Sequence, residues 1–188
     1  MEQITEIENL IGYSFRDKGL LETAFTHSSY CNEHKAESNE KLEFLGDSVL
    51  NFAIAELLYL MSLEDEGAMT VSRASIVSRE PLSAAVEKLG LLKYLRVGEG
   101  VKHVRNWSTK FKSNLFEAVL GAIYLDGGME SAKHFVYNHL GREIAKTAAT
   151  DSKSRLQEYK QARFKDLDLV YKTEENGRKE FESEVYSS

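Results

Sequence analysis

Apolar residues recur at helical spacing through most of the first 150 positions. This spacing predicts amphipathic helices over residues 3–11, 18–25, 67–78 and 79–90. Two longer and more apolar segments, 39–61 and 112–125, predict the central helices of a core. A break at residues 126–128 (Asp-Gly-Gly) separates the second of these from a further predicted helix at 129–149. We therefore predict an all-α domain over residues 1–150.

The pattern changes in residues 151–188. One short helix is predicted at 154–162, and residues 168–173 and 179–186 then alternate apolar and polar positions, which is the period of a strand. The Asn-Gly pair within residues 174–178 predicts a hairpin turn. Because one helix and a two-stranded hairpin bury no core of their own, we expect residues 151–188 to form part of a small, incomplete α+β domain.

Composition narrows the classes of protein to consider. A single cysteine, Cys31, excludes a disulfide framework and a cysteine-based zinc cluster. No apolar run reaches the roughly 18 residues of a membrane span, and the N-terminus lacks the pattern of a signal peptide. We expect a soluble, cytoplasmic protein with no membrane partner. Its 24 basic and 30 acidic residues are unusual for a nucleic-acid-binding protein, which needs clustered Lys and Arg to contact phosphates.

Acidic side chains interrupt the two most apolar helices. Glu40, Glu43 and Asp47 follow one another at i, i+3 and i+7, so they share one helical face. Asn114 and Glu117 are spaced i, i+3 on the other helix. A carboxylate among apolar side chains is costly unless it is paired or bound to a metal. If the two helices pack together, these oxygens converge into a donor set that suits Mg²⁺ or Mn²⁺.

Two other interpretations of these carboxylates are open. They could form a solvated stripe, or pair with Lys41 and Arg73 as ordinary ion pairs. A di-iron bundle is disfavoured because it needs Glu-x-x-His pairs, which the chain lacks. Gly46 and Gly121 lie inside the same two helices, where each costs about 1 kcal/mol relative to alanine. Glycines at such positions often mark a very close approach of another segment.

Residues 40–47, Glu-Lys-Leu-Glu-Phe-Leu-Gly-Asp, resemble the signature motif of the ribonuclease III family. Residues 26–30, 66–74 and 116–128 resemble further segments of that family, in the family's order. Residues 152–159 resemble the opening of its double-stranded RNA-binding domain. The resemblance implies an all-α, homodimeric endonuclease domain over residues 1–150, followed by a partial α+β RNA-binding domain over residues 151–188.

The resemblance also implies an activity. Members hydrolyse double-stranded RNA with Mg²⁺, or with Mn²⁺ in its place, and leave 5′ phosphates and short 3′ overhangs. The expected tasks are the processing of ribosomal RNA precursors and of structured transcripts such as messenger RNA. By position, the implied metal ligands are Glu43, Asp47, Asn114 and Glu117, of which Asp47 and Glu117 are catalytic. The implied RNA contacts are Glu40, Ser154, Gln157 and Glu158, and Glu66 and Arg73 are assigned to the dimer interface or a second metal.

Two departures from the family pattern affect these expectations. The family usually has Asp where this chain has Asn114, and an amide oxygen ligates Mg²⁺ without contributing charge. That substitution supports an alternative function, a catalytically impaired dimer that binds double-stranded RNA. The sequence also stops at Ser188, before the third strand and closing helix of the RNA-binding domain, so we expect the minor-groove contacts of this domain to be incomplete.

Several other residues carry open alternatives. His27 is either a general base or a hydrogen-bonded core histidine. Trp107 lies among the basic residues of segment 102–112, where it either stacks on RNA or packs against its own loop. The basic residues of this segment are the best candidates for phosphate contacts outside the C-terminal part. We expect His103 and His139 to lie at the surface.

Overall fold

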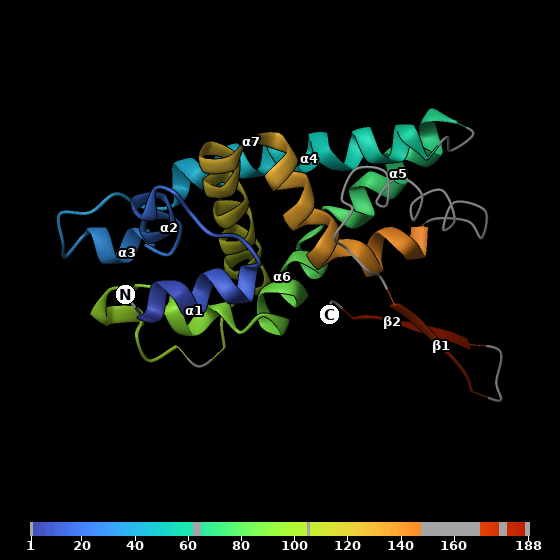
Figure 1. The fold of residues 1–188 in the computed structure, drawn as a ribbon. Coiled ribbons are helices and arrows are strands. Elements are labelled where there is room, and N and C mark those ends of the chain that lie inside the picture. Colours follow the sequence, from blue (N-terminus) through green and yellow to red (C-terminus); the bar gives the residue numbers. More distant parts are fainter. Residues whose placement is uncertain (1, 62–64, 105, 148–169, 177–179, 187–188) are drawn as a thin grey trace.

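A computed structural model describes residues 2–61, 65–104, 106–147, 170–176 and 180–186 (Figure 1). Its elements follow one another as α1 (Glu2–Ile11), α2 (Lys18–Ala24), α3 (Ser28–Cys31), α4 (Glu40–Leu60), α5 (Glu66–Ile76), α6 (Arg79–Lys88), the 3₁₀ turns η1 (Leu91–Tyr94) and η2 (Glu99–Val101), α7 (Thr109–Thr147), β1 (Val170–Asn176) and β2 (Glu180–Tyr186). The predicted helices up to residue 147 are confirmed, with small shifts at their ends. The short elements α3, η1 and η2 were not predicted, because three or four residues carry too little periodicity to detect.

Helices α4 and α7 form the centre of the molecule. In Figure 1, α4 runs along the top, and the first half of α7 stands steeply across it. The two helices bury the apolar faces that the sequence predicted, including Leu50, Ile54 and Phe116, each with no more than a trace of exposed surface. None of the helices in the described part of the chain is long and apolar enough to span a membrane.

Two glycines explain why α4 and α7 approach so closely. A Cβ atom on Gly46 would lie 1.8 Å from the backbone oxygen of Glu117, and one on Gly121 would lie 2.2 Å from that of Leu42. No side chain fits at either position, so each helix presents bare backbone to the other. The predicted close approach at these glycines is confirmed.

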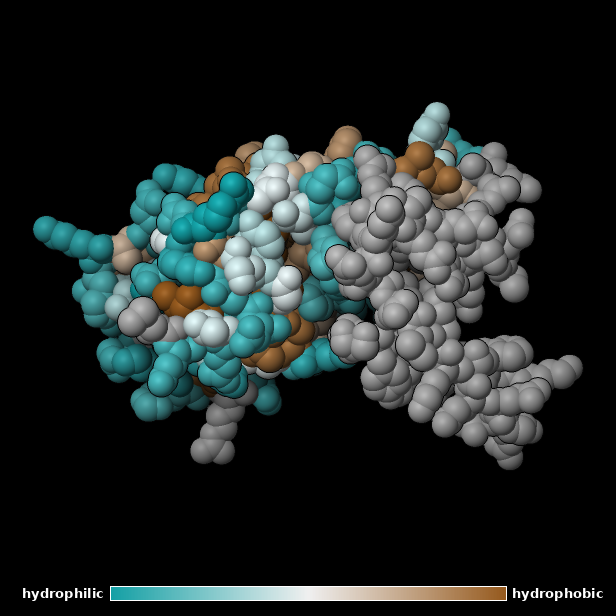
Figure 2. All heavy atoms as spheres, in the orientation of Figure 1, coloured by the Kyte–Doolittle hydropathy of each residue, from teal (hydrophilic) through white to brown (hydrophobic). Residues whose placement is uncertain are grey.

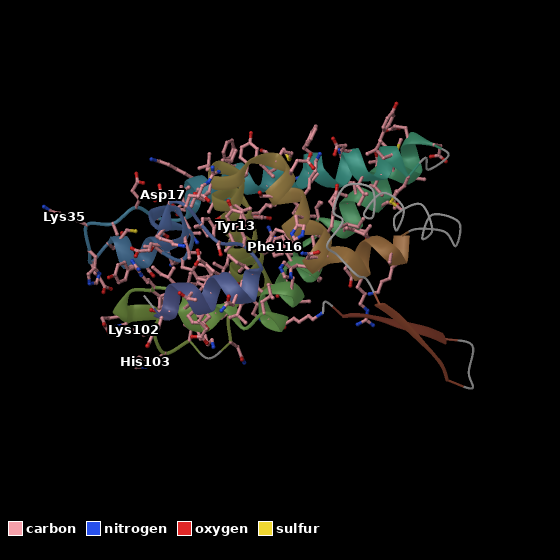
Figure 3. The ribbon with its side chains drawn as sticks, in the orientation of Figure 1. Tyr13, Asp17, Lys35, Lys102, His103 and Phe116 are labelled. Atoms are coloured by element: carbon pink, nitrogen blue, oxygen red, sulfur yellow. The ribbon has the colours of Figure 1, made fainter. Side chains whose placement is uncertain are left out.

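The predicted break in the C-terminal helical region is also confirmed. Within α7, Gly128 adopts φ 78° and ψ −175°, a conformation that favours glycine. Just before it, the carboxylate of Asp126 accepts hydrogen bonds from the Tyr13 hydroxyl (2.7 Å) and from the backbone N–H groups of Arg16 (2.9 Å) and Asp17 (2.8 Å). The connection between α1 and α2, where Figure 3 labels Tyr13 and Asp17, is thereby fixed to the middle of α7.

The C-terminal strands form the predicted hairpin. Strand β1 pairs antiparallel with β2, in a register that runs from Val170 opposite Tyr186 to Asn176 opposite Glu180. The expected turn at 174–178 is wrong in its first half, because β1 continues through Asn176. The predicted helix at 154–162 lies outside the described residues.

His139 is not the surface residue that the sequence predicted. Its Nε2 atom lies 3.1 Å from the carbonyl oxygen of Ile11, and its ring packs edge-on against Phe135, with 4.7 Å between ring centroids. This burial lowers the pKa of His139. The expectation failed because the covering segment, α1, is remote in sequence. His103 does lie at the surface, as Figure 3 shows.

We expect this histidine to make the fold sensitive to mild acid. The unfolded chain, in which His139 has its ordinary pKa of 6.5, binds the proton before the folded chain does. The stability that the neutral, buried His139 contributes is therefore fully present above pH 6.5 and is lost as the pH falls below that value. Melting temperatures between pH 8 and pH 5 test this. Relative to the parent, His139→Gln should lose less stability between pH 8 and pH 5, while His103→Gln, which removes an exposed histidine, should follow the parent. The same pH dependence in all three proteins would contradict the assignment.

Candidate active site

The crossing of α4 and α7 brings carboxylates from both helices together. Glu117 emerges from α7 at the point where its backbone touches Gly46. Burial and the negative charges of Asp47 and Glu43 raise its pKa to about 7. Glu117 is thus close enough to both α4 carboxylates to be repelled by them, as the sequence predicted.

Asn114 faces the same group of carboxylates. Burial raises the pKa of Glu43, and a side-chain hydrogen bond from Asn114 opposes that rise. The amide therefore donates to a carboxylate that an aspartate at this position would repel. Glu40 and Asp47 lie more in the open. The Glu40 carboxylate accepts from the Ser38 hydroxyl (3.1 Å), and that of Asp47 accepts from the side-chain amide of Asn51 (3.1 Å).

Two cations flank the carboxylates. The charge of Lys110, on the first turn of α7, lowers the pKa of Glu43, and the charge of Arg79, on the first turn of α6, lowers that of Glu117. Lys110 belongs to the basic segment 102–112 that the sequence singled out. Arg79 was missed, because no local pattern connects the start of α6 with the α4–α7 crossing.

A small pocket opens beside the carboxylates. It is lined by residues from the start of α3, the start of α4, the segment after η1 and the first turns of α7: His27, Ser28, Asn39, Glu40, Glu43, Leu95, Phe111, Asn114 and Leu115. Most of these residues were not predicted as site residues. They come from four separate segments, and only the tertiary structure brings those segments together.

One wall of this pocket is aromatic. Trp107 stacks on Phe111, with ring centroids 4.1 Å apart and planes inclined by 16°. Phe111 in turn packs against the His27 ring at 4.8 Å. Trp107 thus packs against its own segment, the second of the two alternatives. His27 is half-buried and hydrogen-bonded through Nδ1, and its burial lowers its pKa.

The donor set fits a hard divalent cation in its chemistry. Glu43, Asp47, Glu117 and Asn114 offer only oxygen atoms, which Mg²⁺ and Mn²⁺ prefer. Burial and then the charges of Asp47 and Glu43 raise the pKa of Glu117, and a bound cation would offset both effects. Within the described ranges, however, no group of three or more His, Cys, Asp or Glu side chains is already placed to hold a metal.

Glu66 and Arg73 lie at a different place. Both line an apolar pocket between α4 and α5, together with Ala55, Leu58, Tyr59, Met69 and Thr70. The Glu66 carboxylate accepts from the Thr70 hydroxyl (3.0 Å), and no ion pair between Glu66 and Arg73 is found among the described residues. The structure therefore separates these two residues from the pocket beside Glu43.

Exposed aromatic side chains continue from this second pocket along α4. Phe44, Phe52 and Tyr59 are 79%, 52% and 73% exposed. They are spaced by eight and seven residues, which places them on one face of the helix. Figure 2 shows hydrophobic surface along the upper edge of the molecule, where α4 lies. Apolar surface of this kind is typical of a protein–protein interface.

Three of the predicted RNA contacts have no counterpart in the described structure. Ser154, Gln157 and Glu158 lie outside the residues that the structure describes.

Comparison with known proteins gives a consistent result. A family model described as ribonuclease-III-like matches residues 17–144. Ribonuclease 3 of Oceanobacillus iheyensis is 41% identical over 194 residues, covering 97% of this chain and 85% of its own length. Ribonuclease 3 of Chloroflexus aggregans is 41% identical over 187 residues, covering 94% of this chain and 81% of its own.

Solved structures agree with these relatives. The nuclease domain of ribonuclease III from Campylobacter jejuni superposes with a TM-score of 0.68 at 30% identity, covering 77% of this chain and 97% of that domain. A second structure of the same domain gives a TM-score of 0.66 at 32% identity, and was described for flexibility in a region involved in dimer formation.

Proposed function

The chain belongs to the ribonuclease III family, and from this premise we propose how its residues cleave double-stranded RNA. It is an endoribonuclease that hydrolyses double-stranded RNA. The observation that carries the site assignment is the convergence of Glu43, Asp47 and Glu117 at the α4–α7 crossing, flanked by Lys110 and Arg79. Nothing in the fold or in the relatives favours the binding-only alternative that Asn114 suggested.

Each residue of the crossing has a distinct part in the proposed reaction. Glu43, Asp47, Asn114 and Glu117 would hold Mg²⁺, or Mn²⁺ in its place. When bound, the ion supplies the positive charge that activates a water and stabilises the leaving oxygen. Asp47 and Glu117 would orient the attacking water beside that ion.

The two flanking cations, Lys110 and Arg79, are proposed to attract the negatively charged phosphates of the RNA. Lys110 and Arg79 supply positive charge beside the carboxylates, where a phosphate of the RNA strand has to approach. Local positive charge at the site would therefore allow a chain with a negative net charge to bind RNA there. Glu40, at the rim of the site, would contact the same strand. The expected products carry 5′ phosphates and short 3′ overhangs.

The domain division remains part of the proposal. Residues 1–150 would form the nuclease domain, and residues 151–188 would begin a double-stranded RNA-binding domain in which Ser154, Gln157 and Glu158 contact the minor groove. The β1–β2 hairpin supports this division, since it has the strands expected there. The proposed setting is the cytoplasm, with ribosomal RNA precursors and structured messenger RNAs as substrates.

We also propose that the enzyme is a homodimer through α4 and α5. The exposed stripe of Phe44, Phe52 and Tyr59 and the neighbouring apolar pocket, lined by Glu66 and Arg73, would be buried against a second copy. The relative from Campylobacter jejuni, which has a region involved in dimer formation, supports this proposal.

Phe44→Glu should weaken the dimer. Burying an anchoring aromatic at such an interface contributes about 2 kcal/mol or more, so we expect the dimer dissociation constant to rise at least about 30-fold. Light scattering after size-exclusion chromatography at several concentrations measures it. Val104→Glu changes an exposed apolar residue outside α4 and α5, and should not alter association. A Phe44→Glu protein with the parent's dissociation constant would contradict the proposed interface.

Asn114→Asp should increase the affinity of the site for Mg²⁺. A charged ligand in place of the amide is expected to lower the Mg²⁺ concentration for half-maximal cleavage about 10-fold. A labelled RNA duplex, cut at low salt over a range of Mg²⁺ concentrations, gives this value for both proteins. If neither protein cuts a duplex that it binds, the proposed function is wrong. If both cut with the same Mg²⁺ requirement, residue 114 is not a ligand.

A further inference from the structure

His27 lines the pocket beside the carboxylates. Its Nδ1 atom accepts the backbone N–H of Ser29 (3.2 Å) and lies 2.8 Å from the Ser29 hydroxyl. That hydroxyl accepts the backbone N–H of Gly98 (3.0 Å), so its own hydrogen is free to point at Nδ1. Nδ1 therefore receives hydrogen bonds and carries no proton.

This arrangement determines the tautomer. A neutral imidazole with an unprotonated Nδ1 carries its hydrogen on Nε2, which is then a donor. Among the described residues none hydrogen-bonds Nε2, although His27 lines the pocket. The ring is held between its Ser29 contacts and the Phe111 ring, 4.8 Å away. A donor of fixed direction is thus available to a ligand.

The chemistry around this donor selects the ligand. Glu40 and Glu43 line the same pocket, whereas Lys110 and Arg79 do not, so a phosphate is favoured beside those two cations and a neutral group is favoured in the pocket itself. A ribose 2′-hydroxyl is neutral and both accepts and donates, which allows it to accept from Nε2–H and donate to a carboxylate. A deoxyribose offers neither interaction.

We infer that His27 is a specificity-determining residue that binds the 2′-hydroxyl of a nucleotide next to the cleaved bond, so that the nuclease domain itself distinguishes RNA from DNA. The inference rests on the proposed function, because it requires the RNA strand to pass the α4–α7 crossing. It assigns no step of the hydrolysis to His27.

Two substitutions separate 2′-hydroxyl recognition by His27 from its role in capping α3. His27 also caps α3, since its side chain accepts from Ser29 N–H. Asparagine retains a good capping acceptor but lacks a donor at the Nε2 position. Glutamine caps poorly but carries an amide at the same number of bonds from Cα as Nε2. His27→Asn should therefore keep the melting temperature and lose the recognition, and His27→Gln should show the reverse tendency.

The experiment is a scan of labelled RNA duplexes that each carry a single 2′-deoxy nucleotide near the cleaved bond. One lost hydrogen bond of this kind should slow cleavage by the parent protein about 10-fold at one position. For His27→Asn, the same deoxy duplex should be cut less than about twofold more slowly than the all-RNA duplex, because the two changes remove the same interaction. His27→Gln should retain part of the penalty.

Each outcome decides the question. An unchanged deoxy penalty in His27→Asn, or no penalty at any position in the parent, would overturn the inference. Failure of the parent to cut the all-RNA duplex would instead count against the proposed function. In that case the dissociation constants of the same duplexes are measured by fluorescence anisotropy. The deoxy substitution should then weaken binding to the parent protein and not to His27→Asn.

Discussion

Glu117→Gln is expected to abolish cleavage and yet stabilise the metal-free protein. The loss follows from the proposed role of Glu117 as a metal ligand. Removing such a carboxylate should raise the activation free energy by about 4 kcal/mol, which corresponds to a reaction about 1000-fold slower. The gain follows from the structure, because burial and the charges of Asp47 and Glu43 disfavour an ionised Glu117.

The gain in stability should depend on pH in a defined direction. The folded pKa of about 7 lies above the ordinary value of 4.5, so the folded state holds its proton more tightly than the unfolded chain does. The penalty from Glu117 is absent below pH 4.5, grows between pH 4.5 and 7, and is complete above pH 7. Glutamine should therefore stabilise by about 1–2 kcal/mol at pH 8, after allowance for solvent screening, and by almost nothing near pH 4.5.

Thermal or urea unfolding at pH 8 and pH 5, without divalent cations, measures this difference. Glu80→Gln removes an exposed carboxylate of α6 and serves as the matched control, with no comparable gain expected. Added Mg²⁺ should raise the melting temperature of the parent protein more than that of Glu117→Gln, because only the parent keeps the complete donor set. A Glu117→Gln protein that is less stable than the parent at pH 8 would show that the carboxylates do not repel one another.

Gly46→Ala is expected to be the most damaging single-methyl change in the nuclease domain. On helix propensity alone, alanine should stabilise an interior helical position by about 1 kcal/mol. Here the new Cβ would lie 1.8 Å from the backbone oxygen of Glu117, and its nearest neighbours are all backbone atoms of α7, so no side chain can move away. The helices must separate, so we expect a loss of at least about 3 kcal/mol in the free energy of unfolding.

Cleavage should fall as well, because the same displacement separates Glu43 and Asp47 from Glu117. Gly100→Ala is the control, since its Cβ would have no atom within 4 Å and the residue is exposed. Urea unfolding of both variants, with a cleavage assay on the fraction that remains folded, distinguishes lost stability from lost geometry. If Gly46→Ala is as stable as the parent, the close α4–α7 crossing is incorrect.

Much of this fold was readable from local patterns. The helical period of apolar residues predicted α4 and both halves of α7, and the glycines at 46 and 121 predicted a close approach. The i, i+3, i+7 spacing of Glu40, Glu43 and Asp47 put three carboxylates on one face. These predictions succeeded because each depends on residues within a few turns of the same element.

Other features were beyond local patterns. Arg79 and Lys110 lie on different helices, yet both act on the carboxylates. His139 was expected at the surface and is covered by α1. The pocket with His27 joins four segments whose contacts no spacing within one segment encodes.

The sequence by itself therefore determined which elements form, which face of each is apolar, and which residues carry oxygen donors on those faces. Only the tertiary structure decided that Glu117 is repelled by Asp47 and Glu43, that two cations stand beside them, and that His27 lines the pocket with its Nδ1 held by Ser29. The physical reason is that periodicity reports the environment of one element averaged along its length. Charge, hydrogen bonding and pKa depend instead on the few atoms that a second element brings within several ångströms.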